Sequence, residues 1–151
     1  MRRKEKEITE RADIEAVIAE AQVCHMAMCD GPRPYVVPLS FGYADQTFFF
    51  HCATAGRKLD ILKSNPEVCL ELETRVGLKK GNKACDWGID FRSVIAFGRA
   101  SFVESPEGKR RGLDLIMRQY APGEFEYADA VLAKTLVIRV DVAHMTGKKS
   151  L

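Results

Sequence analysis

A proline in the middle of an apolar run limits the sheets that this chain can form. The run covers residues 35–43, and Pro38 lies near its centre. Proline has no N–H group to donate to a neighbouring strand, so it is confined to edge strands, strand starts and bulges. A second apolar run, residues 47–52, follows the short polar segment 44–46. The two runs predict an antiparallel hairpin, and the proline predicts that part of its first strand leaves backbone groups free for another partner.

The second run leads into a pattern that favours phosphate binding. After Thr54 the chain turns at Gly56 and begins a basic helix with Arg57 and Lys58. Free N–H groups and the positive end of a helix dipole attract an anion, and two cations and a hydroxyl would add to that attraction. The alternative is an ordinary edge strand followed by a solvated helix start, since short motifs of this kind give many false positives.

The rest of the chain predicts a mainly β fold with peripheral helices. Small residues, with Gly98 midway along a long strand, indicate a bend, a bulge or a close backbone approach. Strands do not alternate regularly with helices, so the sheet should be antiparallel and barrel-like. The chain is expected to form one domain, residues 1–151. The expected elements are a helix capped by Thr9, a strand at 23–29, a helix from Gly56 to 64, a strand at 67–74, a loop at 75–83, a strand at 92–104, a helix after Ser105, a mobile loop or short helix at 124–133 and a strand at 135–142.

Charge and cysteine content exclude several classes of function. A formal net charge of +2 gives no reason to expect nucleic acid or a membrane as a main partner. No signal peptide is visible, and five irregularly spaced cysteines do not suggest a disulfide framework, so we expect a cytoplasmic protein with reduced thiols. Possible zinc ligands are Cys24, His25 and Cys29, or His51 and Cys52. Neither group has the paired spacing of structural zinc sites, so no metal site is expected.

Four segments carry a resemblance to a known family. They read RPYVVPLSFGY (33–43), FFFHCATAGRKLDILKSNPEVC (48–69), ACDWGIDFRSVIAFGRA (84–100) and AHMTGKKS (143–150). Together they resemble the pyridoxamine-phosphate-oxidase-like flavoproteins, most closely the nitroimidazole-resistance (Nim-type) branch. The resemblance implies a split β-barrel that binds FMN and forms a homodimer with the site across the interface.

The resemblance also assigns residues to the flavin site. The phosphate would be held by Thr54, Arg57 and Lys58, and the pyrimidine edge would meet the backbone around Pro38. The partner subunit would contribute Ser93 and Val94, with Trp87 just before them. The tail at 143–149 lacks the Arg-x-His signature of the true oxidases, so pyridoxamine phosphate is not the expected substrate. The full expected set is Val37, Pro38, Leu39, Ser40, His51, Ala53, Thr54, Arg57, Lys58, Trp87, Ser93 and Val94.

The expected chemistry is that of an FMN-dependent oxidoreductase. By resemblance, a nitroimidazole or related nitro compound is the acceptor, and reduced nicotinamide or another reductase is the donor. His51 is the candidate catalytic acid, because an ordinary histidine pKa near ~6.5 suits proton transfer around neutrality. His51 could equally hydrogen-bond within the barrel or to the flavin. The alternatives for the whole chain are a flavin-binding module without turnover, a haem-degrading relative and a purely structural dimeric barrel.

Overall fold

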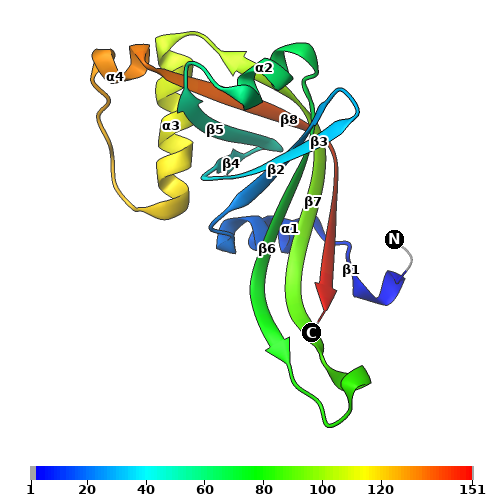
Figure 1. Ribbon diagram of the computed structural model, residues 1–151. Coiled ribbons are helices and arrows are strands. Elements are labelled where there is room, and N and C mark those ends of the chain that lie inside the picture. Colours follow the sequence, from blue (N-terminus) through cyan, green and yellow to red (C-terminus); the bar gives the residue numbers. More distant parts are fainter. Residues whose placement is uncertain (1–2, 151) are drawn as a thin grey trace.

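The computed structural model describes residues 3–150 and shows one antiparallel sheet that curves around a core (Figure 1). Eight strands form the sheet, in the order β3-β2-β6-β7-β8-β5-β4, and β1 pairs with β8. The strands are β1 (Glu7–Ile8), β2 (Cys24–Asp30), β3 (Arg33–Leu39), β4 (Gly42–Ala44), β5 (Thr47–Ala53), β6 (Glu67–Lys79), β7 (Gly88–Val103) and β8 (Thr135–Ser150). The helices are η1 (Lys4–Lys6), α1 (Arg11–Glu20), α2 (Arg57–Ser64), η2 (Ala84–Asp86), α3 (Pro106–Tyr120) and α4 (Asp129–Ala133).

The core follows from the two-residue repeat of the strands. On β7, Val94 and Ala96 are fully buried inside the barrel, whereas Ile95 and Phe97 lie on the outer face, 40% and 51% exposed. The same alternation runs along β2 and β6, so one face of these strands builds the core and the other faces outward. The predicted antiparallel sheet with peripheral helices is therefore confirmed.

Helices close the barrel and cover part of its outside. In Figure 1, α2 lies at one end of the curved sheet and α1 at the other, and apolar residues of both join the main core. A second apolar cluster lies outside the barrel, where α3 and α4 pack on Phe49 and Val137. No helix described here covers the outer face of β2, β6 and β7 around Phe97.

Strands β6 and β7 continue beyond the barrel as a long arm, with η2 near its tip (Figure 1). The arm carries large apolar side chains that no core covers. Val76, Leu78, Trp87 and Ile89 are between 49% and 61% exposed. This arm was only partly expected. Residues 75–83 were predicted to be a loop, but β6 continues through Lys79 after an irregularity between Thr74 and Gly77.

The predicted central hairpin is confirmed only for the end of its first strand. The run 35–43 is interrupted near Ser40, and its first part, β3, pairs with β2 instead of β5. Only β4 pairs with β5, through a two-residue turn in which Asp45 and Gln46 both have positive φ angles, 48° and 62°. The edge position of Pro38 is nevertheless confirmed, because β3 is the last strand at one end of the sheet.

The remaining boundaries agree with expectation in part. The helix after Gly56 and the one capped by Ser105 are confirmed, and the Ser105 hydroxyl accepts a hydrogen bond from the Gly108 N–H. Thr9 does not cap α1, whose N-cap is Glu10. Strands β7 and β8 are longer than predicted, and β8 continues through residues 143–150. Residues 124–133 end in the short helix α4.

Strands β7 and β8 approach each other closely at Gly98. A Cβ atom at this position would overlap the Asp141 carbonyl oxygen, and the register between the two strands shifts at Phe97 and Gly98. Gly98→Ala should therefore lower the free energy of unfolding by about 1–3 kcal/mol, as overpacking does. The matched control is Gly77→Ala, because a Cβ there meets nothing within 4 Å. Urea denaturation measures both, and equal losses for the two variants would contradict the close approach.

Candidate functional site

The free edge of β3 is the first part of the site. Within residues 3–150, β3 forms a ladder with β2 only, and Pro38 lies opposite His25 in that ladder. The side chains of Val37 and Leu39 pack against the core, while Pro38 and Ser40 are exposed. Val37 and Leu39 can therefore reach a ligand on the outside through their backbone alone.

The start of α2 is the second part. Gly56 precedes the helix with a φ of 144°, a conformation that favours glycine. The Arg57 guanidinium donates to the Asp30 carboxylate at 3.1 Å and lies 4.6 Å from the centre of the Tyr35 ring. These contacts attach the start of α2 to the tip of the β2–β3 hairpin. Arg57 is thus already engaged, which the sequence did not indicate.

Lys58, in contrast to Arg57, has no ion-pair partner among residues 3–150. Its side chain is half-buried. Its charge reaches Cys52, where burial raises the pKa of the thiol and Lys58 opposes that rise. From Tyr35, beside the start of α2, to Pro38 is three residues along β3, about 10 Å at the usual rise of a strand. The contact of Arg57 with Tyr35 therefore places the start of α2 beside the same strand that carries the predicted ring residues.

His51, Ala53 and Thr54 lie at the exposed end of β5 and in the turn that follows. His51 pairs with Val137 of β8 and shares the outer face with Phe49, as predicted, whereas Phe50 and Cys52 face the main core. No hydrogen-bond partner of the His51 ring lies among residues 3–150. Its side chain is exposed and able to meet a ligand.

The structure does not bring Trp87, Ser93 and Val94 to this place within one chain. Trp87 follows η2 on the arm, whose tip lies at the opposite end of the molecule from α2 (Figure 1). Ser93 faces outward between Glu73 and Lys148 of the neighbouring strands. Val94 is fully buried in the barrel, so its side chain packs in the core.

A cluster that sequence reasoning missed lies between Pro38 and Ser93. His25 on β2 stands opposite Glu71 on β6, and its Nδ1 atom is 3.3 Å from the Glu71 carboxylate and 3.7 Å from that of Glu73. All three side chains lie on the outer face. The two-residue alternation of 67–74 places both glutamates on the polar face, but nothing local reveals that His25 pairs with Glu71.

This cluster perturbs a carboxyl group. Burial, followed by the neighbouring Glu73 carboxylate, raises the pKa of Glu71 from 4.5 to about 7, and His25 only partly opposes the rise. The folded chain therefore holds a proton that the unfolded chain releases more readily. Glu71 favours the fold fully below about pH 4.5, and that contribution is lost as the pH rises through about 7.

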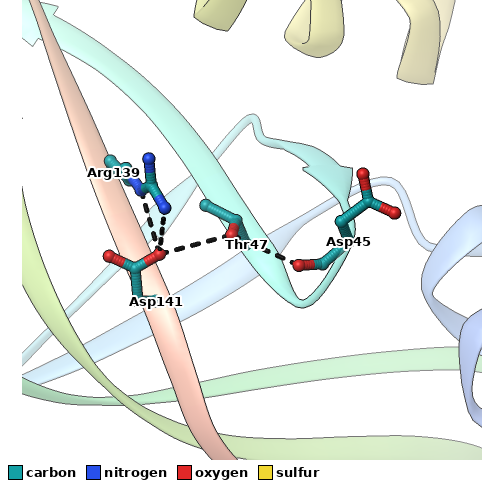
Figure 2. Close-up of polar contacts among 4 residues, drawn as sticks. All are labelled: Asp45, Thr47, Arg139 and Asp141. Atoms are coloured by element: carbon teal, nitrogen blue, oxygen red, sulfur yellow. Dashed lines mark hydrogen bonds and ion pairs between the residues drawn. The ribbon is translucent and has the colours of Figure 1, made fainter.

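A second polar group lies at the opposite end of β5 (Figure 2). The Arg139 guanidinium donates twice to one oxygen of Asp141, at 2.9 and 2.6 Å, and the Thr47 hydroxyl lies 3.4 Å from the same oxygen. A cavity of about 320 Å³ adjoins this group between β4, β5, β8 and α3. None of the predicted flavin residues lines it.

The structure also bears on two possibilities weighed from the sequence, a zinc site with cysteine ligands and a membrane partner. Cys24 is buried in the barrel while its neighbour His25 faces outward, so the thiol-based zinc set considered from the sequence is split between two faces. None of the helices within residues 3–150 has the length and apolar character needed to cross a bilayer.

Comparison with known proteins gives a family match and one match to a curated sequence. Residues 10–149 match the family described as pyridoxamine 5'-phosphate oxidase. An uncharacterised protein from Rhizobium meliloti is 26% identical over 101 residues, which are 67% of this chain. The match spans about 60% of the length of that relative.

Solved structures with the same fold include three with informative descriptions. A provisionally assigned 5-nitroimidazole antibiotic resistance protein from Bacteroides thetaiotaomicron is 33% identical with a TM-score of 0.86, covering 95% of this chain and 86% of that one. The flavocytochrome Anf3 from Azotobacter vinelandii is 21% identical with a TM-score of 0.87, covering 100% and 72%. A FAD and haem binding protein from Mycobacterium smegmatis is 19% identical with a TM-score of 0.87, covering 96% and 73%.

Proposed function

The chain belongs to the pyridoxamine 5'-phosphate oxidase family, and from that premise we propose that it is an FMN-binding oxidoreductase acting on small nitro-aromatic compounds. The observation that carries the proposal is that the basic start of α2 contacts Tyr35, three residues along β3 from the free edge at Pro38. The 33% identical Bacteroides protein supports the nitroimidazole class of substrate. The Azotobacter and Mycobacterium proteins support a flavin-type cofactor through their descriptions alone.

The residues fit a mononucleotide. A phosphate at the start of α2 would meet the Lys58 ammonium and the N–H groups of the first helical turn, with the Thr54 hydroxyl beside them. A planar ring lying along β3 would meet the backbone that Pro38 leaves free at the sheet edge. Bound FMN would supply the redox chemistry, and the protein would supply orientation and electrostatics.

Replacing Lys58 with Ala tests the phosphate position. The variant should bind FMN at least about 10-fold more weakly, because a charge-assisted contact to phosphate is lost, while riboflavin, which has no phosphate, should bind as it does to the unchanged protein. Fluorescence quenching of each flavin measures both affinities.

The matched control is Lys63→Ala, at the last turn of the same helix. It should leave FMN binding unchanged. If neither FMN nor FAD binds at micromolar concentration, the flavin proposal fails as a whole. If Lys58→Ala weakens FMN and riboflavin equally, the phosphate lies elsewhere. A protein that binds haem and no flavin would support the haem-binding alternative.

A second copy of the chain would complete the site. The outer face of the sheet exposes Val36, Ile95 and Phe97, and the arm exposes Trp87, at 40–59%. Apolar patches of this kind mark interaction surfaces. Pairing of two copies through this face would cover the patch and would allow Ser93 and Trp87 of one copy to approach α2 of the other, which one chain alone does not permit.

Phe97→Glu tests the pairing. A charge on the covered face should convert a dimer into a monomer in sedimentation velocity and should weaken FMN binding at the same time. The control is Val131→Glu, a similarly exposed apolar residue, 54%, on the short helix α4. A wild-type monomer that binds FMN tightly would contradict the shared site.

His51 is the proposed proton donor to the substrate. It is exposed at the end of β5, immediately before the turn that leads to Lys58. His51→Ala should leave FMN bound and slow nitro reduction by reduced nicotinamide about 10²-fold, the usual scale of general acid catalysis. Absorbance of the nitro compound follows the rate. Unchanged turnover with bound flavin would make His51 a packing or flavin-orienting residue, and no turnover in any variant would favour a binding module.

A further inference from the structure

The outer face of the sheet holds a group of side chains that the flavin site does not use. We propose that His25, Glu71 and Glu73 bind one Zn²⁺ ion, or a similar divalent transition metal, in each chain. One donor atom from each residue lies within 4.8 Å of the other two. The site needs no flavin, so its binding of zinc can be tested apart from the flavin proposal, although it lies on the face that is proposed to pair with a second copy.

The sheet holds the three donors in place. His25 and Glu71 are direct partners in the β2–β6 ladder, and Glu73 follows two residues later on the same face of β6. Cross-strand partners bring their Cβ atoms to about 4.5–5.5 Å, so two adjacent strands present all three side chains together. Their side chains are 36–39% exposed, which leaves them open to an ion from solution.

The distances suit a tetrahedral ion. The His25 Nδ1 atom lies 3.3 Å from the nearer Glu71 oxygen and 3.7 Å from that of Glu73. In a tetrahedral zinc site with bonds of about 2.0–2.2 Å, neighbouring ligand atoms are roughly 3.3–3.6 Å apart. An ion could therefore bind with small side-chain adjustments. A fourth position would remain for water or another ligand.

The charges favour a cation. Neither Glu71 nor Glu73 has a lysine or arginine partner within residues 3–150, and His25 is their only ion-pair partner there. Glu67, on the same face of the same strand, is by contrast paired with Arg99 at 2.8 Å. One imidazole and two carboxylates form a nitrogen and oxygen set that suits Zn²⁺, whereas Ca²⁺ takes six to eight oxygen ligands.

Access to the ion is open from one side. Glu73 also lines a cleft of about 500 Å³ beside Gln22 and Val23, near the end of α1. Pro38 and Ile95 flank the cluster on the strands to either side, and they offer no side-chain donor. The fourth ligand of the ion would therefore come from solvent, from a small molecule in the cleft or, in the proposed dimer, from the copy that covers this face.

The test is a titration of the chelator-treated, reduced full-length protein with ZnCl₂ by isothermal titration calorimetry. Zinc should bind once per chain with micromolar affinity or better. His25→Gln, Glu71→Gln and Glu73→Gln should each weaken binding by at least about 10-fold. In NMR spectra of the histidine ring nitrogens, zinc should shift the Nδ1 signal of His25 and leave those of His51 and His144 in place.

The controls separate this site from other zinc-binding groups. Glu67→Gln keeps the strand and the face but removes a carboxylate outside the cluster, and Cys69→Ser removes the thiol two residues before Glu71. Both should bind zinc like the unchanged protein, and circular dichroism should show all variants folded. Absence of stoichiometric binding, survival of binding in Glu71→Gln and Glu73→Gln, or its loss in Cys69→Ser would overturn the proposal.

Discussion

The two ladders that join β7 to β6 on one side and to β8 on the other are the interactions on which the rest of the structure depends. They fix the register of the three longest strands, and side chains alternate between faces with a period of two. A slip of one residue would turn Val94 and Ala96 outward and bring Ile95 and Phe97 into the core. The same ladders thus determine the core, the outer face and the direction of the arm.

Local sequence patterns predicted several individual elements of the fold. The alternation of residues 92–104, the close approach at Gly98, the helix after Gly56 and the cap at Ser105 all follow from neighbours in sequence. Which strands pair with each other does not follow from neighbours in sequence. The run 35–43 looks continuous, yet the chain passes near Ser40 from one end of the sheet to the other. Residues 75–79 resemble a loop because this part of β6 has no core to pack against.

The candidate site likewise has one part that local sequence signals predict and another part that depends on contacts between distant residues. The strand, turn and helix that include Thr54, Arg57 and Lys58 form one short segment, so their common location could be read from the sequence. The contact between Arg57 and Asp30 and the cluster of His25 with Glu71 join residues 27 and 46 positions apart. These distant contacts depend on the order of the strands, which no pattern in the chain reveals.

The seam between β3 and β4 has a consequence for how the barrel moves. These strands stand at the two ends of the sheet, and among the strands described no ladder joins them. Buried Phe41 lies between them, and its N–H donates to the Tyr120 hydroxyl, which itself donates to the Gln22 carbonyl. Segments held by so few bonds open at lower free energy than the whole fold. We therefore expect local opening along this line to cost less free energy than separation of β7 from its neighbours, and such opening would include the edge that carries Pro38.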